Sequence, residues 1–179
     1  MDITFIDFFS GIGGFHSGFE KAGMKCIGWC EFDKNAQKSY RALYDTKGLY
    51  FNDDVRKIRG WELPNATLWS FGFPCQDVSI AGKQKGIGRG TRSGRVQPGR
   101  CNIITTHGTA GVLMDTSPVR IRKLTPKECW RLQGFSDEQF EKAAKVNSNT
   151  QLYKQAGNAV TVNVAEAIGK HIVGIIKGE

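Results

Sequence analysis

Short apolar runs separated by turn residues characterise the first 73 residues of the chain. Continuous apolar runs of this kind are typical of strands that are buried on both faces of a parallel sheet. They predict strands at residues 3–9, 24–30, 49–51 and 68–73. Helical periodicity lies between them, at residues 15–22, which end at Gly23, and at residues 34–44. Strands and helices therefore alternate, and this order predicts an α/β fold with a Rossmann-like parallel sheet.

The last third of the chain has a helical pattern. Thr125 is a predicted N-cap, with a proline directly after it and Glu128 in position to complete a capping box, so a helix is expected over residues 126–132. Ser136 begins a second predicted helix, which ends near residue 146. The final predicted helix covers residues 162–176. Its apolar residues repeat at helical spacing and are therefore expected in the core: Val162, Val164, Ala165, Ile168, Ile172 and Ile175.

Composition adds a basic net charge to this picture. The 179 residues fit one domain, and 25 Lys and Arg against 17 Asp and Glu give a net charge of +8. Such an excess favours a polyanionic partner, above all nucleic acid, although a solvated basic surface explains the charge alone equally well. The five cysteines show no CxxC spacing and the three histidines show no ligand spacing, so neither zinc nor any other metal is predicted. No apolar run approaches a membrane span, and a cytoplasmic protein with reduced thiols is expected.

The first predicted strand leads into a glycine-rich turn and then a helix. This arrangement brings backbone N–H groups and a helix N-terminus towards a ligand, although the spacing is not the GxGxxG of dinucleotide sites. Glu31 follows Gly13 at close to the ~20-residue offset of acids that accept hydrogen bonds from ribose hydroxyls. Phe32 is then available to cover an adenine face. Asp33 is predicted to cap the helix over residues 34–44.

Cys75 follows the fourth predicted strand. Pro74 ends that strand, which places the cysteine on a loop at the carboxyl edge of the sheet, where ligands of α/β proteins bind. A lone cysteine is most often a small buried hydrophobe, but this position makes Cys75 a candidate nucleophile. The glycine-, lysine- and arginine-rich residues 81–94 come next. They suit either a plain loop or a lid that closes on a phosphate backbone.

Four motifs carry a resemblance to one enzyme family. They are Phe-Pro-Cys-Gln with a following serine (residues 73–79), Asp-x-Phe-x-Gly-x-Gly-Gly (7–14), Arg-Lys-Leu-Thr-Pro-x-Glu-Cys-x-Arg-Leu-Gln-Gly-Phe (122–135) and Gly-Asn-x-Val (157–160). Together they closely resemble the DNA (cytosine-5) methyltransferases over about residues 3–94 and 101–174. The resemblance implies a fold in which the C-terminal helices complete the cofactor side of the sheet.

The resemblance also implies a cofactor, a reaction and a partner. The cofactor is S-adenosyl-L-methionine, and the residues that the motifs assign to it are Asp7, Phe9, Gly11, Gly13, Gly14, Glu31, Phe32, Asp54, Val55, Asn158, Ala159 and Val160. Cys75 is then the nucleophile that adds to a flipped cytosine. Double-stranded DNA is the substrate, with contacts expected from Gln76, Ser79, Lys83, Lys85, Arg89 and Arg92. Asp54 is expected at the adenine amino group, while a helix cap remains the alternative. Such a protein is expected to be bacterial or phage-encoded.

The chain departs from the family's pattern after Gly94. The family's Glu-Asn-Val and Gln-x-Arg-x-Arg motifs are absent, no fifth apolar strand follows, and most of the DNA-reading region is missing. An internal deletion accounts for this, with residues 1–94 as the cofactor and catalytic half, 95–118 as a remnant of the DNA-reading region and 119–179 folding back. The fourth strand is then an open sheet edge. We expect weak cofactor binding and no unaided methylation.

Two functions of different classes therefore remain open. One is a cytosine-5 methyltransferase. The other is a non-catalytic remnant that binds cofactor or DNA, or that pairs with a chain carrying the missing strands. A nicotinamide-dependent oxidoreductase is disfavoured because the chain lacks GxGxxG.

Overall fold

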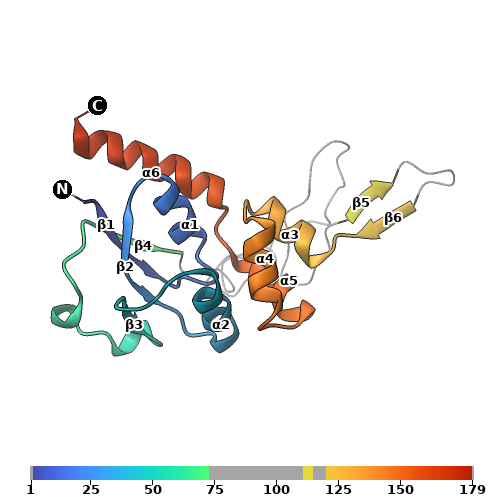
Figure 1. Ribbon diagram of the computed structural model, residues 1–179, viewed down its shortest axis with the longest axis horizontal. Coiled ribbons are helices and arrows are strands. Elements are labelled where there is room, and N and C mark those ends of the chain that lie inside the picture. Colours follow the sequence, from blue (N-terminus) through green and yellow to red (C-terminus); the bar gives the residue numbers. More distant parts are fainter. Residues whose placement is uncertain (1, 73–110, 115–119, 179) are drawn as a thin grey trace, which may run out of the picture.

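Four parallel strands form a sheet in the order β3-β2-β1-β4. The computed structural model describes residues 2–72, 111–114 and 120–178. The elements along the chain are β1 (Thr4–Phe8), α1 (Gly14–Lys21), β2 (Lys25–Cys30), α2 (Lys34–Leu43), β3 (Tyr50–Asn52), the 3-10 turns η1 (Val55–Lys57) and η2 (Gly60–Glu62), β4 (Leu68–Phe71), β5 (Gly111–Met114), β6 (Arg120–Lys123), α3 (Pro126–Leu132), α4 (Asp137–Ala144), α5 (Asn149–Asn158) and α6 (Val162–Lys177). The expected α/β fold with a parallel Rossmann-like sheet is confirmed (Figure 1).

Strand β1 lies at the centre of the sheet and is buried on both faces. Successive side chains of a strand point to opposite faces, and here Phe5 and Ile6 belong to two different clusters. Phe5 packs with Phe19 of α1 and Ala165 of α6. Ile6 faces the other way, where residues of the 55–66 segment pack against it. One face is therefore covered by helices and the other by the connection from β3 to β4.

Strand β4 lies at an edge of the described sheet, as expected for the fourth strand. It pairs only with β1 among the described strands, with Phe8 opposite Phe71. The sequence predicted a buried strand, but Trp69 and Phe71 are 52% and 60% exposed. The Trp69 ring makes a T-shaped contact with Phe8 of β1. The predicted strand is therefore confirmed, but the prediction that it is buried on both faces was wrong.

Helix α6 packs on α1 through small residues. A Cβ on Gly18 would meet Ala165, and a Cβ on Gly169 would meet Ala22 and Phe19, so glycine permits this close approach. The prediction that all the periodic apolar residues are core was wrong for three of them. Val164, Ile168 and Ile175 are exposed, whereas Ala165 and Gly169 of the same helix pack on α1. Periodicity shows that residues share one side of a helix, but not that another element covers it.

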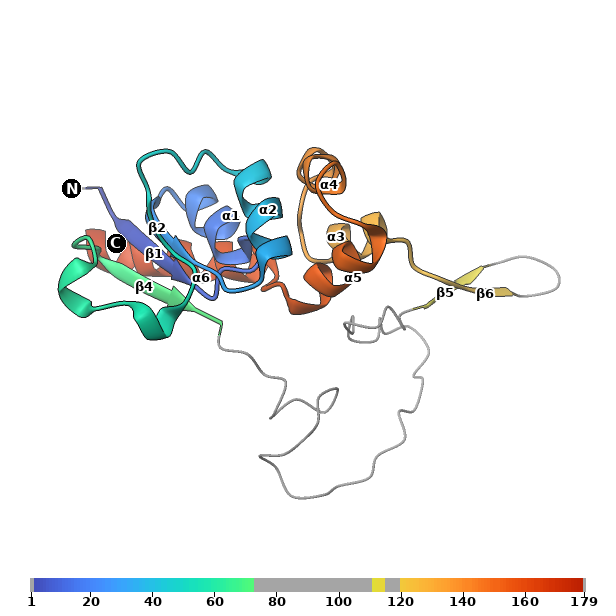
Figure 2. The same ribbon diagram turned by 90° about the horizontal axis from the view of Figure 1, so that it is seen from below.

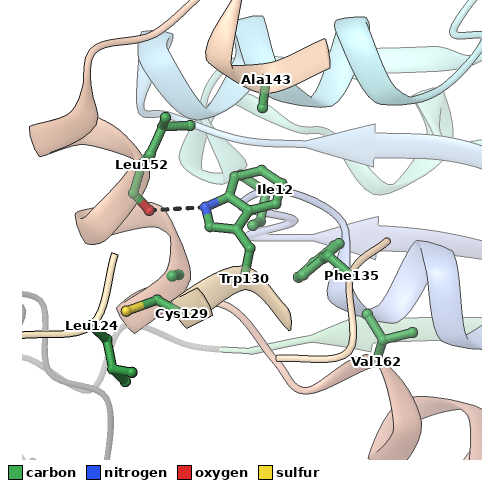
Figure 3. Packing of buried hydrophobic residues seen from close by; sticks show 9 residues of the cluster. Ile12, Leu124, Cys129, Trp130, Phe135, Ala143, Leu152 and Val162 are labelled. Atoms are coloured by element: carbon green, nitrogen blue, oxygen red, sulfur yellow. Dashed lines mark hydrogen bonds between the residues drawn. The ribbon is translucent and has the colours of Figure 1, made fainter. Parts of the chain in front are cut away.

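The C-terminal helices α3, α4 and α5 form a second cluster beside α2 at one end of the sheet (Figure 2). Both features predicted for the start of α3 are present. Thr125 and Glu128 form the capping box, and Pro126 is the first residue of the helix. Trp130 is the centre of this cluster, and its indole N–H donates to the Leu152 carbonyl at 3.0 Å (Figure 3). Ile12 of the glycine-rich turn packs into the same cluster. The second cluster therefore supports the turn that precedes α1.

Residues 149–177 satisfy a length and hydropathy criterion for crossing a membrane. In the structure they form two helices, α5 and α6, and the backbone between them is extended at Ala159 and Thr161. One side of α6 is buried against α1. This segment therefore packs as part of the α/β fold.

Candidate cofactor site

The turn between β1 and α1 contains several residues in the left-handed region. Gly11 and Gly13 have φ of 56° and 81°, and Phe9 has φ of 53°, which is uncommon for a bulky residue. The turn is closed by the Gly13 N–H, which donates to the Ser10 carbonyl at 2.7 Å. A Cβ on Gly11 would meet nothing within 4 Å, so this side of the turn is open. Strain at such a position is typical of a ligand-binding turn.

Glu31 fixes its carboxylate against this turn. One oxygen accepts the Gly11 N–H at 2.7 Å and the other accepts the Asp33 N–H at 2.7 Å. A carboxylate has about four lone-pair sites, so two remain for further donors such as hydroxyl groups. Phe32 is 70% exposed beside it. Asp33 caps α2 as predicted, accepting from the N–H groups of Asn35 and Ala36.

The Asp54 carboxylate is bound by Arg56, two residues further along the chain. Its carboxylate accepts the Arg56 N–H at 3.0 Å and pairs with the Arg56 guanidinium, with the shortest N–O distance at 2.7 Å. These Arg56 hydrogen bonds lower the Asp54 pKa to about 2. The structure therefore contains the helix cap, for η1, that was the alternative at this position. Val55 packs against the cluster of Ile6, Phe8 and Cys30. Contact of Asp54 and Val55 with an adenine stays a prediction.

The segment that joins α5 to α6 lies against the glycine-rich turn. A Cβ on Gly14 would meet the Val160 carbonyl oxygen, and Gly72 lies beside the Val160 side chain. Gly157 and Asn158 form the last turn of α5 instead of a free turn, and the link itself is Ala159–Thr161. Ala159 packs against the Trp130 cluster. The start of α1, the 159–161 link and the end of β4 therefore lie next to one another, although they are far apart in the sequence.

Asp7 lies beneath the turn and is 0% exposed. Its Oδ1 accepts the Ser70 hydroxyl at 3.1 Å, while its Oδ2 has no hydrogen-bond partner. Burial is the main reason why the Asp7 pKa rises to about 7. Asp7 was predicted to bind the cofactor, and this stays a prediction for a side chain that is fully buried.

Comparison with known proteins decides the family. The profile of the C-5 cytosine-specific DNA methylase family matches residues 3–114 and 89–174, which together include nearly the whole chain. This chain belongs to the C-5 cytosine-specific DNA methylase family. It is 38% identical over 144 residues to the orphan methyltransferase M.SPBetaI of Bacillus phage SPbeta. This match covers 72% of this chain and 31% of that relative.

Two further relatives match shorter parts of the chain. The orphan methyltransferase M.Rho11sI of Bacillus phage rho11s is 56% identical over 73 residues, which are 40% of this chain and 14% of that protein. The type II methyltransferase M.HhaI of Haemophilus parahaemolyticus is 38% identical over 91 residues, 50% of this chain and 27% of that protein. The chain therefore spans less than a third of the length of these three relatives.

Cys75, the nucleophile that the family resemblance predicts, lies outside the described residues. The same holds for the six predicted DNA-contacting residues, Gln76, Ser79, Lys83, Lys85, Arg89 and Arg92, and for residues 95–110. The described structure does place Gly72, three residues before Cys75, beside Val160 and Phe15. Gly72 therefore lies at the carboxyl edge of the sheet, next to the glycine-rich turn.

The sequence analysis did not identify Tyr44 as part of this candidate site. The Tyr44 hydroxyl is within 3.1 Å of the Ile12 carbonyl, 2.8 Å of the Gly13 carbonyl and 2.7 Å of the Ser17 hydroxyl. It thereby supports the turn from the end of α2. No local pattern distinguishes Tyr44 from an ordinary helix-end tyrosine, so only the tertiary structure reveals it.

A cavity of about 920 Å³ lies beside Phe32, between α2 and the end of β3.

Proposed function

We propose that this chain binds S-adenosyl-L-methionine at the glycine-rich turn and is the cofactor-binding and nucleophile-bearing part of a DNA cytosine-5 methyltransferase. One observation carries the proposal most strongly. The Glu31 carboxylate is held at 2.7 Å from the Gly11 N–H, with the exposed Phe32 ring next to it. A fixed acid, an open turn and an aromatic ring match the diol, the polar tail and the base of that cofactor.

The residues present fit this cofactor. Glu31 would accept hydrogen bonds from the ribose hydroxyls, and Phe32 would cover one face of the adenine. The open side of Gly11 leaves room where any side chain would intrude on a ligand. When bound, S-adenosyl-L-methionine supplies the methyl group. Asn158, Ala159 and Val160 would close the site from the C-terminal side.

The role of Cys75 follows from the family resemblance. Its thiolate would bond to C6 of a cytosine flipped out of double-stranded DNA and would leave again when C5 loses its proton. Cytosine is a poor electrophile unless an acid protonates or hydrogen-bonds N3. The Glu-Asn-Val motif that supplies this acid in the family is absent. We therefore expect cofactor binding but no measurable methylation by the chain alone.

Replacing Glu31 by alanine is expected to weaken S-adenosyl-L-methionine binding by roughly tenfold or more, because a hydrogen bond to a charged group is lost. Isothermal titration calorimetry on the purified chain measures the effect. Glu62→Ala is the matched control, since Glu62 is an exposed acid on η2. Equal affinities for all three proteins would contradict the assignment of Glu31. Absence of binding in the unaltered chain would contradict the proposed function.

A second function is favoured by the open edge of the sheet. Strand β4 presents an unpaired edge among the described strands, and Trp69 and Phe71 are exposed beside it. An unprotected apolar edge tends to pair with another strand. On this basis the chain acts as one half of an enzyme whose partner polypeptide carries the remaining strands and the acid.

Complementation tests this second function. The chain would be co-expressed with a fragment of M.SPBetaI that covers the part of that relative outside its match to this chain. The expected result is a co-purifying complex that methylates DNA, lost in the double variant Trp69→Lys/Phe71→Lys. Formation of the complex by the double variant would show that the β4 edge is not the contact. A chain that stays alone in both cases would remove this second function.

A further inference from the structure

The side chain of Tyr44, at the end of α2, contacts the glycine-rich turn with both its ring and its hydroxyl group. The hydroxyl oxygen lies 2.8 Å from the Gly13 carbonyl oxygen and 3.1 Å from the Ile12 carbonyl oxygen. A Cβ at position 13 would overlap the tyrosine ring, so only glycine allows this approach. The ring also stacks on His16 of α1, at 3.8 Å between ring centroids. Tyr44 is therefore held between the turn and α1.

The Tyr44 hydroxyl also connects the turn with α4, in the C-terminal part of the chain. It lies 2.7 Å from the hydroxyl of Ser17 in α1, and the Gln139 side-chain N–H donates to the same serine at 2.9 Å. The other end of the Gln139 amide has a partner as well, because its Oε1 accepts the Ser136 N–H in the capping box of α4. A glutamine that caps one helix therefore reaches the first turn of another.

The contacts from Gln139 through Ser17 and Tyr44 to Gly13 form a hydrogen-bond relay with one consistent direction. The Gln139 N–H can only donate, so the serine oxygen accepts it and the serine proton is available for the tyrosine oxygen. Carbonyl oxygens only accept, so the tyrosine proton points to the turn. Burial raises the pKa of Tyr44 well above its usual range, so the hydroxyl keeps this proton. Hydrogen bonds in series polarise and strengthen one another.

The relay ends on the peptide group between Gly13 and Gly14. The carbonyl of this peptide accepts from the Tyr44 hydroxyl and from the Ser17 N–H, the latter at 2.9 Å. In a trans peptide the N–H points away from the carbonyl, so the two donors also set the direction of the Gly14 N–H. This N–H belongs to the first turn of α1, whose N–H groups have no acceptor within the helix and are presented to a ligand.

We infer that Tyr44, Ser17 and Gln139 are positioning residues of the glycine-rich turn, and that their relay orients the Gly13–Gly14 peptide for ligand binding. The C-terminal helices then act on the site through a directed hydrogen-bond relay, in addition to the packing of Ile12 into their cluster. The effect on the turn stands by itself, whereas its effect on S-adenosyl-L-methionine affinity rests on the proposed function.

Tyr44→Phe tests the relay because it removes the hydroxyl and keeps the ring. Amide hydrogen exchange is measured by NMR without cofactor at positions 13 and 17. The Gly13 N–H donates to the Ser10 carbonyl and the Ser17 N–H donates to the Gly13 carbonyl, so both report on the turn. We expect exchange at both amides to become roughly tenfold faster, since one hydrogen bond that holds the turn is lost.

Tyr153→Phe is the matched control. The Tyr153 hydroxyl donates to the Leu124 carbonyl at 2.6 Å, so the control also removes one tyrosine hydrogen bond to a backbone carbonyl, but outside the turn. We expect no change of exchange at positions 13 and 17 in this variant. Gln139→Glu is a second variant, because a glutamate still completes the capping box but cannot donate to Ser17. It should accelerate exchange at the same two amides while α4 stays folded.

Unchanged exchange at positions 13 and 17 in Tyr44→Phe, or an equal acceleration in Tyr153→Phe, would overturn the positioning role. Unchanged exchange in Gln139→Glu would remove Gln139 from the relay. Calorimetry should give roughly tenfold weaker S-adenosyl-L-methionine binding for Tyr44→Phe and unaltered binding for Tyr153→Phe. Equal affinities in these two variants would contradict the effect on the ligand. No binding by the unaltered chain would count against the proposed function alone, since the exchange data decide the role of the relay without cofactor.

Discussion

Replacing Trp130 by alanine is expected to lower the free energy of unfolding by about 3–5 kcal/mol. The ring is 0% exposed and packs at 5.2 Å from Phe135 and 5.7 Å from Phe140, measured between ring centroids. The substitution leaves a cavity between α3, α4 and α5 and removes the donor to the Leu152 carbonyl. Because typical domains are stable by only about 5–15 kcal/mol, much of the folded population would be lost. Urea unfolding followed by circular dichroism measures the change.

Trp61→Ala is the matched control for this prediction. Trp61 is 80% exposed on η2, so its removal is expected to change stability by less than about 0.5 kcal/mol. Similar losses in the two variants would show that the buried cluster does not hold the C-terminal helices in place. Since Ile12 packs into the Trp130 cluster, the same variant should also loosen the glycine-rich turn.

Replacing Gly14 by alanine is the second change with a large expected effect. Its Cβ would press on the backbone of Val160, which lies at 2.9 Å for the carbonyl carbon and 3.2 Å for Cα. A backbone group yields less readily than a flexible side chain, so either the turn or the 159–161 link must move. We expect a loss of about 1–3 kcal/mol in stability and at least roughly tenfold weaker cofactor binding.

Gly60→Ala is the control for Gly14→Ala. A Cβ at position 60 would meet nothing within 4 Å. Thermal unfolding and calorimetry with S-adenosyl-L-methionine are the measurements, on both variants and the unaltered chain. If Gly14→Ala behaved like Gly60→Ala in both, the contact between the first turn and the α5–α6 link would have no part in the site.

The elements that could be predicted from the sequence are those specified by neighbouring residues. The capping box of Thr125 and Glu128 and the cap at Asp33 are satisfied within a few residues, so local sequence suffices for them. The apolar runs that form β1 and β2 are buried on both faces and carry the pattern of a parallel sheet. The family motifs at residues 7–14 and 122–135 also lie in these well-specified parts.

Helix α5 was missed because nothing local marks it as a helix. Residues 149–158 are rich in polar residues and end in Gly157 and Asn158, which favour turns. Leu152 and Ala156 make the segment helical by packing against the Trp130 cluster, where both are buried. A tertiary contact thus outweighs a weak local preference.

By itself, the sequence determined the order of the four parallel strands and of helices α1 to α4 and α6, the caps, the glycine-rich turn and the family. Each of these depends on residues that are close together along the chain or on motifs read directly from it. Only the tertiary structure decided that Asp7 is buried, that Tyr44 supports the turn, that Val160 meets Gly14, and that apolar residues of α6 and β4 are exposed within the described part of the chain. These features depend on which elements lie next to one another, and a one-dimensional pattern records which residues can be buried but not what covers them.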